Sequence, residues 1–142
     1  RSSLPGYLLL ATLHTNVAPR AVTRLTDMGI EPFLLSSSLL GVLAQRLVRK
    51  LCTHCKREDA QHRWHPVGCP ECGMTGYKGR TGVYELMAAD DEIRALIHAQ
   101  AAESKLFEVA QRGGMKTMRD DGDRLVAEGV TSLEEVLRVT RE

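Results

Sequence analysis

The chain has 142 residues, of which 43% are hydrophobic and 26% charged, the composition of an ordinary globular protein that can bury one core. Its net charge of +1 gives no overall electrostatic reason to expect nucleic-acid binding. The charge is uneven, however, because residues 1–51 carry six basic and two acidic side chains, whereas residues 83–142 carry eight basic and thirteen acidic ones. The first part is therefore expected either to face something negative or to present a solvated basic surface.

The apolar runs are much shorter than the roughly 20 residues that a membrane-spanning helix needs. We therefore expect no transmembrane or targeting segment. The opening residues 1–5 lack an initiator Met and lead directly into an apolar run. This beginning indicates a piece of a longer protein.

Residues 6–13 form a nearly continuous apolar run, which predicts a strand buried on both faces of a parallel sheet. The polar His14 follows, and Asn16 is predicted to cap a helix that runs to Met28 and stops at Gly29. Ligands of open α/β sheets bind where a strand ends and a helix begins. His14 could therefore donate a hydrogen bond to a phosphate there, or merely bond a neighbouring carbonyl in the turn.

Pro32 is predicted to start a second helix, whose apolar residues recur at intervals of three and four: Phe33, Leu35, Leu39, Val42 and Leu43. We predict a switch to extended chain near Arg46. This arginine belongs to a basic group with Arg49 and Lys50, and an arginine fork can hold phosphate oxygens. The alternative is that the group is simply solvated.

All four cysteines fall into two C-x-x-C pairs separated by thirteen residues: Cys52, Cys55, Cys69 and Cys72. Each C-x-x-C turn can point two sulfurs inward, and two such turns can supply the four tetrahedral ligands of a structural zinc ion. The surrounding residues 52–82 are rich in Gly, Pro and His and poor in large apolar side chains. Because such a segment cannot build a core of its own, a metal is expected to hold it together.

Two other uses of these cysteines are open. Disulfides would need the same number of cysteines, although a chain without a secretory segment points to a reducing compartment. A redox C-x-x-C motif would be expected once rather than twice. The neighbouring His54, His62 and His65 could compete as ligands, but with four cysteines available we expect them to be solvated.

The rest of the chain is predicted to be one strand followed by helices. Residues 79–87 read as the strand that leaves the cysteine-rich segment. Helices are predicted to begin at Asp90, to include Leu106 before stopping at Gly113, and to begin again at two capping boxes, Thr117 with Asp120 and Thr131 with Glu134. The acidic pairs at 90–91 and 120–121 are assigned to these helix starts and not to catalysis.

The chain contains neither the G-x-x-x-x-G-K-[ST] loop that cradles nucleotide phosphates nor an apolar strand that ends in an acidic pair for magnesium. By itself it is therefore not expected to hydrolyse nucleotide.

Several long blocks resemble a known family: residues 10–16, 23–33, 36–49, 79–86 and 119–122, together with the four cysteines. They are similar to the C-terminal portion of the type II secretion ATPase, the E protein, a branch of the secretion-superfamily P-loop ATPases that includes the type IV pilus assembly motors. The resemblance covers essentially the whole chain. It implies an α/β fold in three parts: residues 1–51 from the end of a RecA-like core, an inserted zinc module at 52–82, and a C-terminal helical subdomain at 83–142.

The resemblance also implies roles for individual residues. His14 falls in the family's histidine box, near the γ-phosphate of ATP, and the four cysteines match its zinc-binding subdomain. Arg46 lies in the block Ala-Gln-Arg-Leu, with a weaker implied role at the nucleotide or between subunits. The intact protein would be an ATP- and magnesium-dependent homo-hexamer in the cytoplasm, docked on inner-membrane secretion-platform proteins and touching the membrane only peripherally.

Some features depart from the family. Pro5 and Tyr7 replace an expected Thr and His, and the loop between the cysteine pairs is short. The family's phosphate-binding and magnesium-binding boxes would precede residue 1, so this chain alone is expected to be inactive. The alternative is a freestanding zinc-ribbon module that binds nucleic acid or protein, using Trp64 and Tyr77 with the basic residues around the cysteines.

Overall fold

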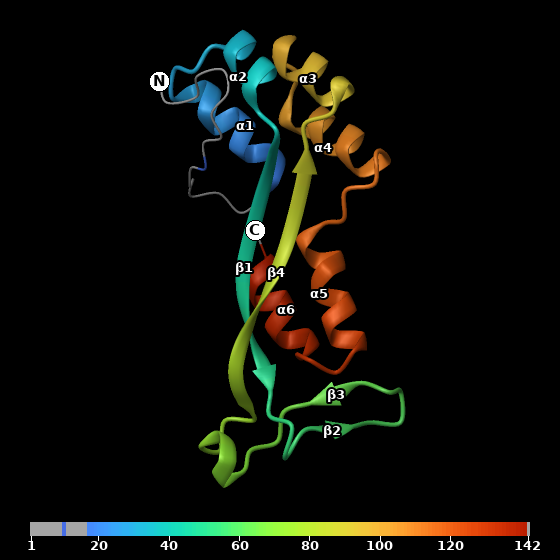
Figure 1. The fold of residues 1–142 in the computed structure, drawn as a ribbon. Helices are drawn as coiled ribbons and strands as arrows, with labels where there is room; N and C mark the ends of the chain where they lie inside the picture. The colour runs from blue at the N-terminus through green and yellow to red at the C-terminus, as the bar shows by residue number, and fades with distance from the viewer. Residues whose placement is uncertain (1–9, 11–16, 142) are drawn as a thin grey trace. The chain divides into compact units, whose positions relative to one another are not determined.

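The computed structural model describes Leu10 and residues 17–141, so the predicted strand at 6–13, apart from Leu10, and His14 lie outside the described residues. The chain divides into two compact units, residues 1–44 with 86–115 and residues 45–85 with 116–142. Strands β1 (Gly41–Leu51) and β4 (Tyr77–Ala88) pair as a two-stranded sheet, and the arrows in Figure 1 run in opposite directions. Both strands contribute residues to each unit.

The first unit contains four helices in the part that the structure describes: α1 (Ala18–Asp27), α2 (Pro32–Ser38), α3 (Asp91–His98) and α4 (Glu103–Arg112). Helix α1 packs on α4, α2 on α3, and α3 on α4. Their facing sides are apolar, since the buried side chains include Ala18, Val22, Leu35, Ile93, Ile97, Leu106 and Val109. This packing of amphipathic faces is what stabilises helices of only 7 to 10 residues.

The ends of these helices test the predicted caps. The predicted helix start at Asp90 is confirmed, and Asp90 is the N-cap of α3, because its carboxylate accepts a hydrogen bond of 2.9 Å from the Ile93 amide. Gly29 follows the last residues of α1 with a φ of +91°, a conformation that favours glycine, so the predicted stop is also confirmed. The N-cap of α1 is Val17 and not Asn16, and the Pro residue at the start of the helix fixes this position instead of a side-chain cap.

The predicted length of the second helix is wrong. Helix α2 ends at Ser38, Leu39 has extended backbone angles, and β1 already begins at Gly41. Val42 and Leu43, predicted to be helical, are therefore strand residues. The hydroxyl groups of Ser36 and Ser37 donate back to the Phe33 carbonyl, about one turn earlier in the helix. The strand that follows pairs with β4.

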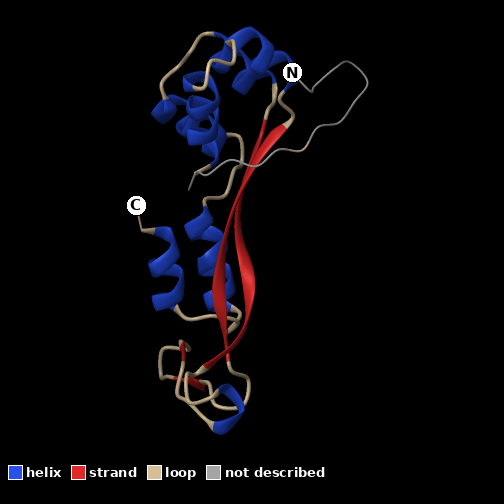
Figure 2. Ribbon diagram, turned by 90° about the vertical axis from the view of Figure 1, so that its left-hand side faces the viewer, coloured by secondary structure: helices blue, strands red, loops and turns tan. Residues whose placement is uncertain are grey.

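The second unit carries the cysteine-rich segment and two helices. Besides parts of β1 and β4, it contains β2 (Arg57–Glu58) paired antiparallel with β3 (Trp64–His65), the short 3₁₀ helix η1 (Pro70–Cys72), α5 (Met118–Ala127) and α6 (Leu133–Thr140). Helices α5 and α6 pack against each other and lie beside the strands, as Figure 2 shows. The fully buried Val48, Val83 and Val136 belong to the core of this unit.

One of the two predicted capping boxes is confirmed. At the start of α5, the Thr117 hydroxyl accepts from the Asp120 amide, and the Asp120 carboxylate accepts from the Thr117 amide. At α6 the prediction is wrong by one residue, since the N-cap is Ser132, whose hydroxyl accepts from the Glu135 amide. Thr131 instead donates its hydroxyl hydrogen to the Arg49 carbonyl, at 2.7 Å. Its side chain therefore links the turn between α5 and α6 to β1 by a hydrogen bond.

The close approach of α5 to α6 depends on Gly122. A Cβ at this position would clash with a methyl group of Val136, which is completely buried. We expect Gly122→Ala to destabilise the chain by about 1–2 kcal/mol, because the steric cost of overpacking exceeds the helix-propensity gain of alanine. Chemical denaturation of this variant beside Asp123→Ala, an exposed change in the same helix, measures the difference. A Gly122→Ala chain more stable than the wild type would contradict the contact.

No helix in residues 17–141 combines the length and the hydrophobicity needed to cross a membrane.

Candidate metal centre

The four cysteine sulfurs gather at one point of the second unit. All lie within 4.8 Å of one another, although they come from two turns that are seventeen residues apart in the chain. The Sγ atoms of Cys52 and Cys69 are 3.8 Å apart, those of Cys55 and Cys72 3.9 Å, and those of Cys69 and Cys72 3.8 Å. The sequence-based prediction that the two C-x-x-C pairs face each other is therefore confirmed.

These distances fit a metal better than a disulfide. Four thiolates held at about 2.3 Å from a tetrahedral zinc ion would place their sulfurs about 3.8 Å apart. A disulfide would need sulfurs about 2.05 Å apart, and all four cysteines are free. The cluster can therefore hold a metal ion with little movement of the chain.

Backbone amides donate hydrogen bonds to two sulfurs of the cluster. The Gly68 amide donates to Cys55 Sγ at 3.3 Å, and the Gly76 amide donates to Cys72 Sγ at 3.2 Å. Burial by itself raises the pKa of Cys72, but hydrogen bonds from the amides of Cys69 and Gly76 lower it to about 6. Burial raises the pKa of the adjacent Cys69 to about 11.

The histidines near the cluster are used elsewhere or exposed. His62 Nδ1 lies 2.9 Å from a Glu58 carboxylate oxygen, and His65 Nε2 lies 2.7 Å from an Asp59 oxygen. The hydrogen bond with His65 is the main cause that lowers the pKa of Asp59 to about 2. His54 is exposed inside the first cysteine turn. The cluster of potential ligands in the described residues contains the four cysteines and no histidine.

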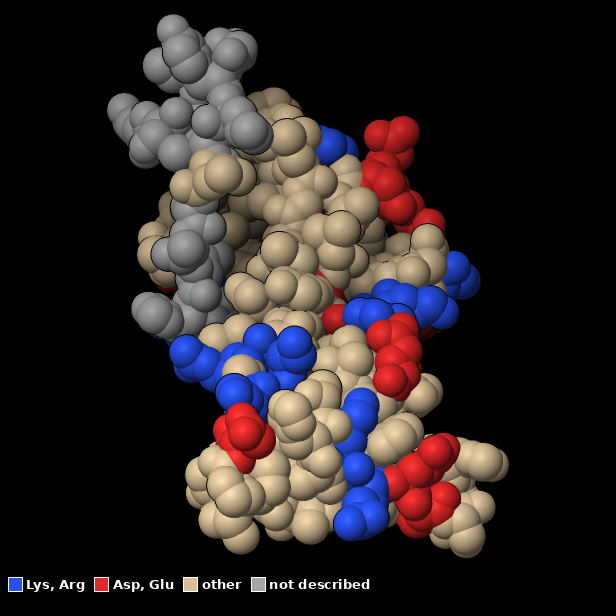
Figure 3. Space-filling view, turned by 60° about the horizontal axis from the view of Figure 1, so that its bottom comes forward, with Lys and Arg blue, Asp and Glu red and all other residues tan. Residues whose placement is uncertain are grey.

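The three residues of the predicted basic group on β1 have different environments in the structure. Arg49 donates to the buried carboxylate of Glu135 at 2.7 Å, and its guanidinium lies 4.2 Å from the centre of the Tyr77 ring. Arg46 and Lys50 are exposed, and neither has an ion pair within residues 17–141. Figure 3 shows Lys and Arg side chains gathered on the displayed face. Arg46 therefore stays available for the predicted anion contact, while Arg49 has a structural role.

Residue Glu135 was missed by sequence reasoning. Burial by itself would raise its pKa, but hydrogen bonds from Arg138 and Arg49 lower the pKa to about 2. The Arg49 amide also donates to this carboxylate, at 2.9 Å. The N-cap of α6 lies one residue later than predicted, at Ser132, so the Thr131 and Glu134 spacing pointed to the neighbouring glutamate instead of Glu135.

The chain is similar to secretion-system proteins over nearly its whole length. The model of a family described as type II/IV secretion system protein matches residues 1–138. The chain is 62% identical over 142 residues to the type II secretion system protein HxcR of Pseudomonas aeruginosa, covering 100% of this chain and 30% of HxcR. It is 51% identical over 158 residues to the type II secretion system ATPase E of Vibrio cholerae, covering 100% of this chain and 31% of that protein.

Pilus motors are similar as well. The chain is 45% identical over 159 residues to the type IV pilus assembly ATPase PilB of Thermus thermophilus, covering 99% of this chain and 18% of PilB. A crystal structure of the pilus retraction motor PilT with bound ADP matches at a TM-score of 0.60 and 26% identity, covering 92% of this chain and 31% of that one. The chain thus spans less than a third of the length of each of these relatives. With a family model that matches nearly every residue, the chain belongs to the type II/IV secretion system protein family.

Proposed function

We propose that this chain is the C-terminal part of a motor ATPase that powers type II protein secretion, coupling ATP hydrolysis to pseudopilus assembly and protein export. The observation that carries the proposal is the 62% and 51% identity, over the whole chain, to two type II secretion proteins, one of which is named an ATPase. In the intact protein we place ATP and magnesium in a RecA-like core. The three-part division at 1–51, 52–82 and 83–142 belongs to the same proposal.

The proposed role of this part is support and sensing rather than independent catalysis. His14 would lie near the γ-phosphate of bound ATP, and Arg46 would contact nucleotide or a neighbouring subunit. The four cysteines would hold a structural zinc ion, which four soft thiolates favour. The intact protein would act as a hexamer in the cytoplasm at the bacterial inner membrane, on secretion-platform proteins.

The nucleic-acid alternative is less well supported. It requires exposed aromatic rings on which bases can stack. The Trp64 ring has the Lys56 ammonium 4.5 Å from its centre, and Tyr77 is engaged by Arg49 and by the Ser132 hydroxyl at 2.7 Å. These rings serve contacts within the chain. If titration with an oligonucleotide gave no salt-dependent binding signal, this result would agree with the view that the chain does not bind nucleic acid.

Nucleotide turnover tests the main proposal. We expect the 142-residue chain alone to show no ATP hydrolysis, because it lacks the phosphate-binding loop, and the intact protein to hydrolyse ATP. In the intact protein, His14→Ala should lower turnover by about 100-fold, the usual cost of losing one hydrogen-bond donor to developing charge. His98→Ala, an exposed histidine at the end of α3, serves as the control. ATP turnover by this chain alone would contradict its proposed dependence on the rest of the protein. Unchanged turnover in the intact His14→Ala protein would contradict the proposed role of His14.

A further inference from the structure

The turn between α5 and α6 is held by residues that bracket the first cysteine pair. Leu51 immediately precedes Cys52, and its amide donates to the Val130 carbonyl at 2.8 Å. Lys56 immediately follows Cys55, and its ammonium group donates to the Gly129 carbonyl at 2.8 Å. The two ends of one C-x-x-C turn therefore bind two successive carbonyls of a turn that lies more than seventy residues later in the chain.

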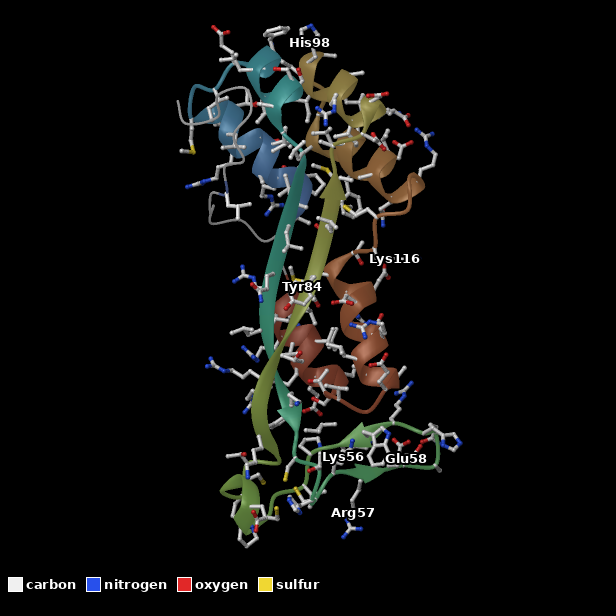
Figure 4. The ribbon with its side chains drawn as sticks, viewed as in Figure 1. Lys56, Arg57, Glu58, Tyr84, His98 and Lys116 are labelled. Atoms are coloured by element: carbon white, nitrogen blue, oxygen red, sulfur yellow. The ribbon has the colours of Figure 1, made fainter. Side chains whose placement is uncertain are left out.

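Trp64 adds an apolar contact to this attachment. It lies on β3, opposite Glu58 of β2, and the Lys56 ammonium group sits over its ring at 4.5 Å. Gly129 is buried with a φ of +73°, and a Cβ there would lie 2.8 Å from the Trp64 ring. The ring and the glycine are thus in direct contact. Figure 4 shows Lys56 at the base of the β2–β3 hairpin.

The second cysteine pair is also linked by hydrogen bonds to the start of α6. The Gly76 amide donates to Cys72 Sγ, while the Gly76 carbonyl accepts from the Cys52 amide at 2.9 Å. The next residue is Tyr77, whose hydroxyl lies 2.7 Å from that of Ser132, the N-cap of α6. Both cysteine turns are therefore followed in the chain by a residue that holds the start of α6 or the turn before it.

We propose that the metal centre works as a latch for the α5–α6 helix pair: metal binding fixes Lys56 and Trp64 in the geometry that grips Gly129. The proposal rests on metal binding by the four cysteines and goes beyond it, because it assigns the ion a specific mechanical effect on the C-terminal helices. The β2–β3 hairpin has two residues in each strand. So short a hairpin cannot hold its own shape without the metal.

The chain supplies its own reporter for the test, since Trp64 is its only tryptophan. The reduced full chain is stripped of metal with a chelator and then titrated with Zn²⁺. On stripping, we expect the Trp64 emission to shift to longer wavelength and the amides of residues 129–137 to exchange hydrogen faster, while amides of α3 and α4 keep their protection. One equivalent of Zn²⁺ should reverse both changes. Unchanged emission and exchange, or no zinc uptake at all, would overturn the latch.

Two variants separate the latch from general unfolding, because both should keep one zinc per chain. Gly129→Ala pushes a methyl group into the Trp64 ring, and Lys56→Met removes the donor. Each should show the red-shifted emission and faster exchange at 129–137 even with zinc bound. Gly29→Ala, at a left-handed glycine with open space, and Lys50→Met, at an exposed lysine, are the matched controls. Variants that behave like their controls would overturn the proposal, and none of these readouts depends on ATP hydrolysis.

Discussion

Replacing Cys72 with serine is expected to weaken metal binding strongly and to destabilise the segment 52–82. The four thiolates share an apparent binding free energy of about 10–16 kcal/mol in structural zinc sites, so the loss of one weakens affinity on the order of 100-fold or more. The Cys72 sulfur also accepts a hydrogen bond from the Gly76 amide. Its loss therefore removes a ligand and a backbone contact together.

Zinc content and thermal unfolding of the reduced protein measure this effect. The wild-type chain should carry one zinc ion, and a chelator should lower its melting temperature, whereas Cys72→Ser should melt at a lower temperature and lose its zinc to about 100-fold less chelator. His54→Ser is the matched control, since His54 lies in the first cysteine turn but outside the ligand cluster. A wild-type chain that is zinc-free, with a melt untouched by chelators, would refute the metal centre.

Replacing Glu135 with alanine is expected to destabilise the chain by about 2–4 kcal/mol, because it leaves the Arg49 amide without its acceptor and opens a cavity in the core. This loss is smaller than the cost of breaking a fully buried ion pair, about 3–5 kcal/mol, because the side chains of Arg49 and Arg138 are half exposed to solvent. Glu134→Ala is the control, because this neighbouring glutamate is exposed. Equal stability of the two variants would contradict the network.

The same carboxylate predicts a pH dependence. Its pKa is lowered to about 2 in the folded chain, from an ordinary value near 4.3. The unfolded chain therefore binds the proton more readily, so the stabilisation is complete above about pH 4.3 and is lost as the pH falls toward 2. Denaturation midpoints measured across this range should fall less steeply for Glu135→Ala than for Glu134→Ala. Parallel curves would show that Glu135 is not the titrating group.

The sequence predicts a structural feature correctly where all the residues that form it lie within one short segment. The Asp90 cap and the Thr117 capping box each involve residues three apart, so their hydrogen bonds form within a single turn. The start of β1 could not be read in this way. Its buried residues Ala44 and Val48 are four apart, a spacing that fits a helix and also a strand, and the choice depends on pairing with β4, which comes about forty residues later.

The family and the four potential metal ligands can be identified from the amino-acid chain alone, because identity blocks and C-x-x-C spacing are properties of the chain that need no coordinates. The roles of Glu135, Lys56 and Trp64 are visible only in the folded molecule. Each is bonded to, or packed against, a residue more than sixty positions away, and such partners leave no periodicity or motif in the chain. Their roles follow from burial and distance, which exist only after the strands and helices have packed.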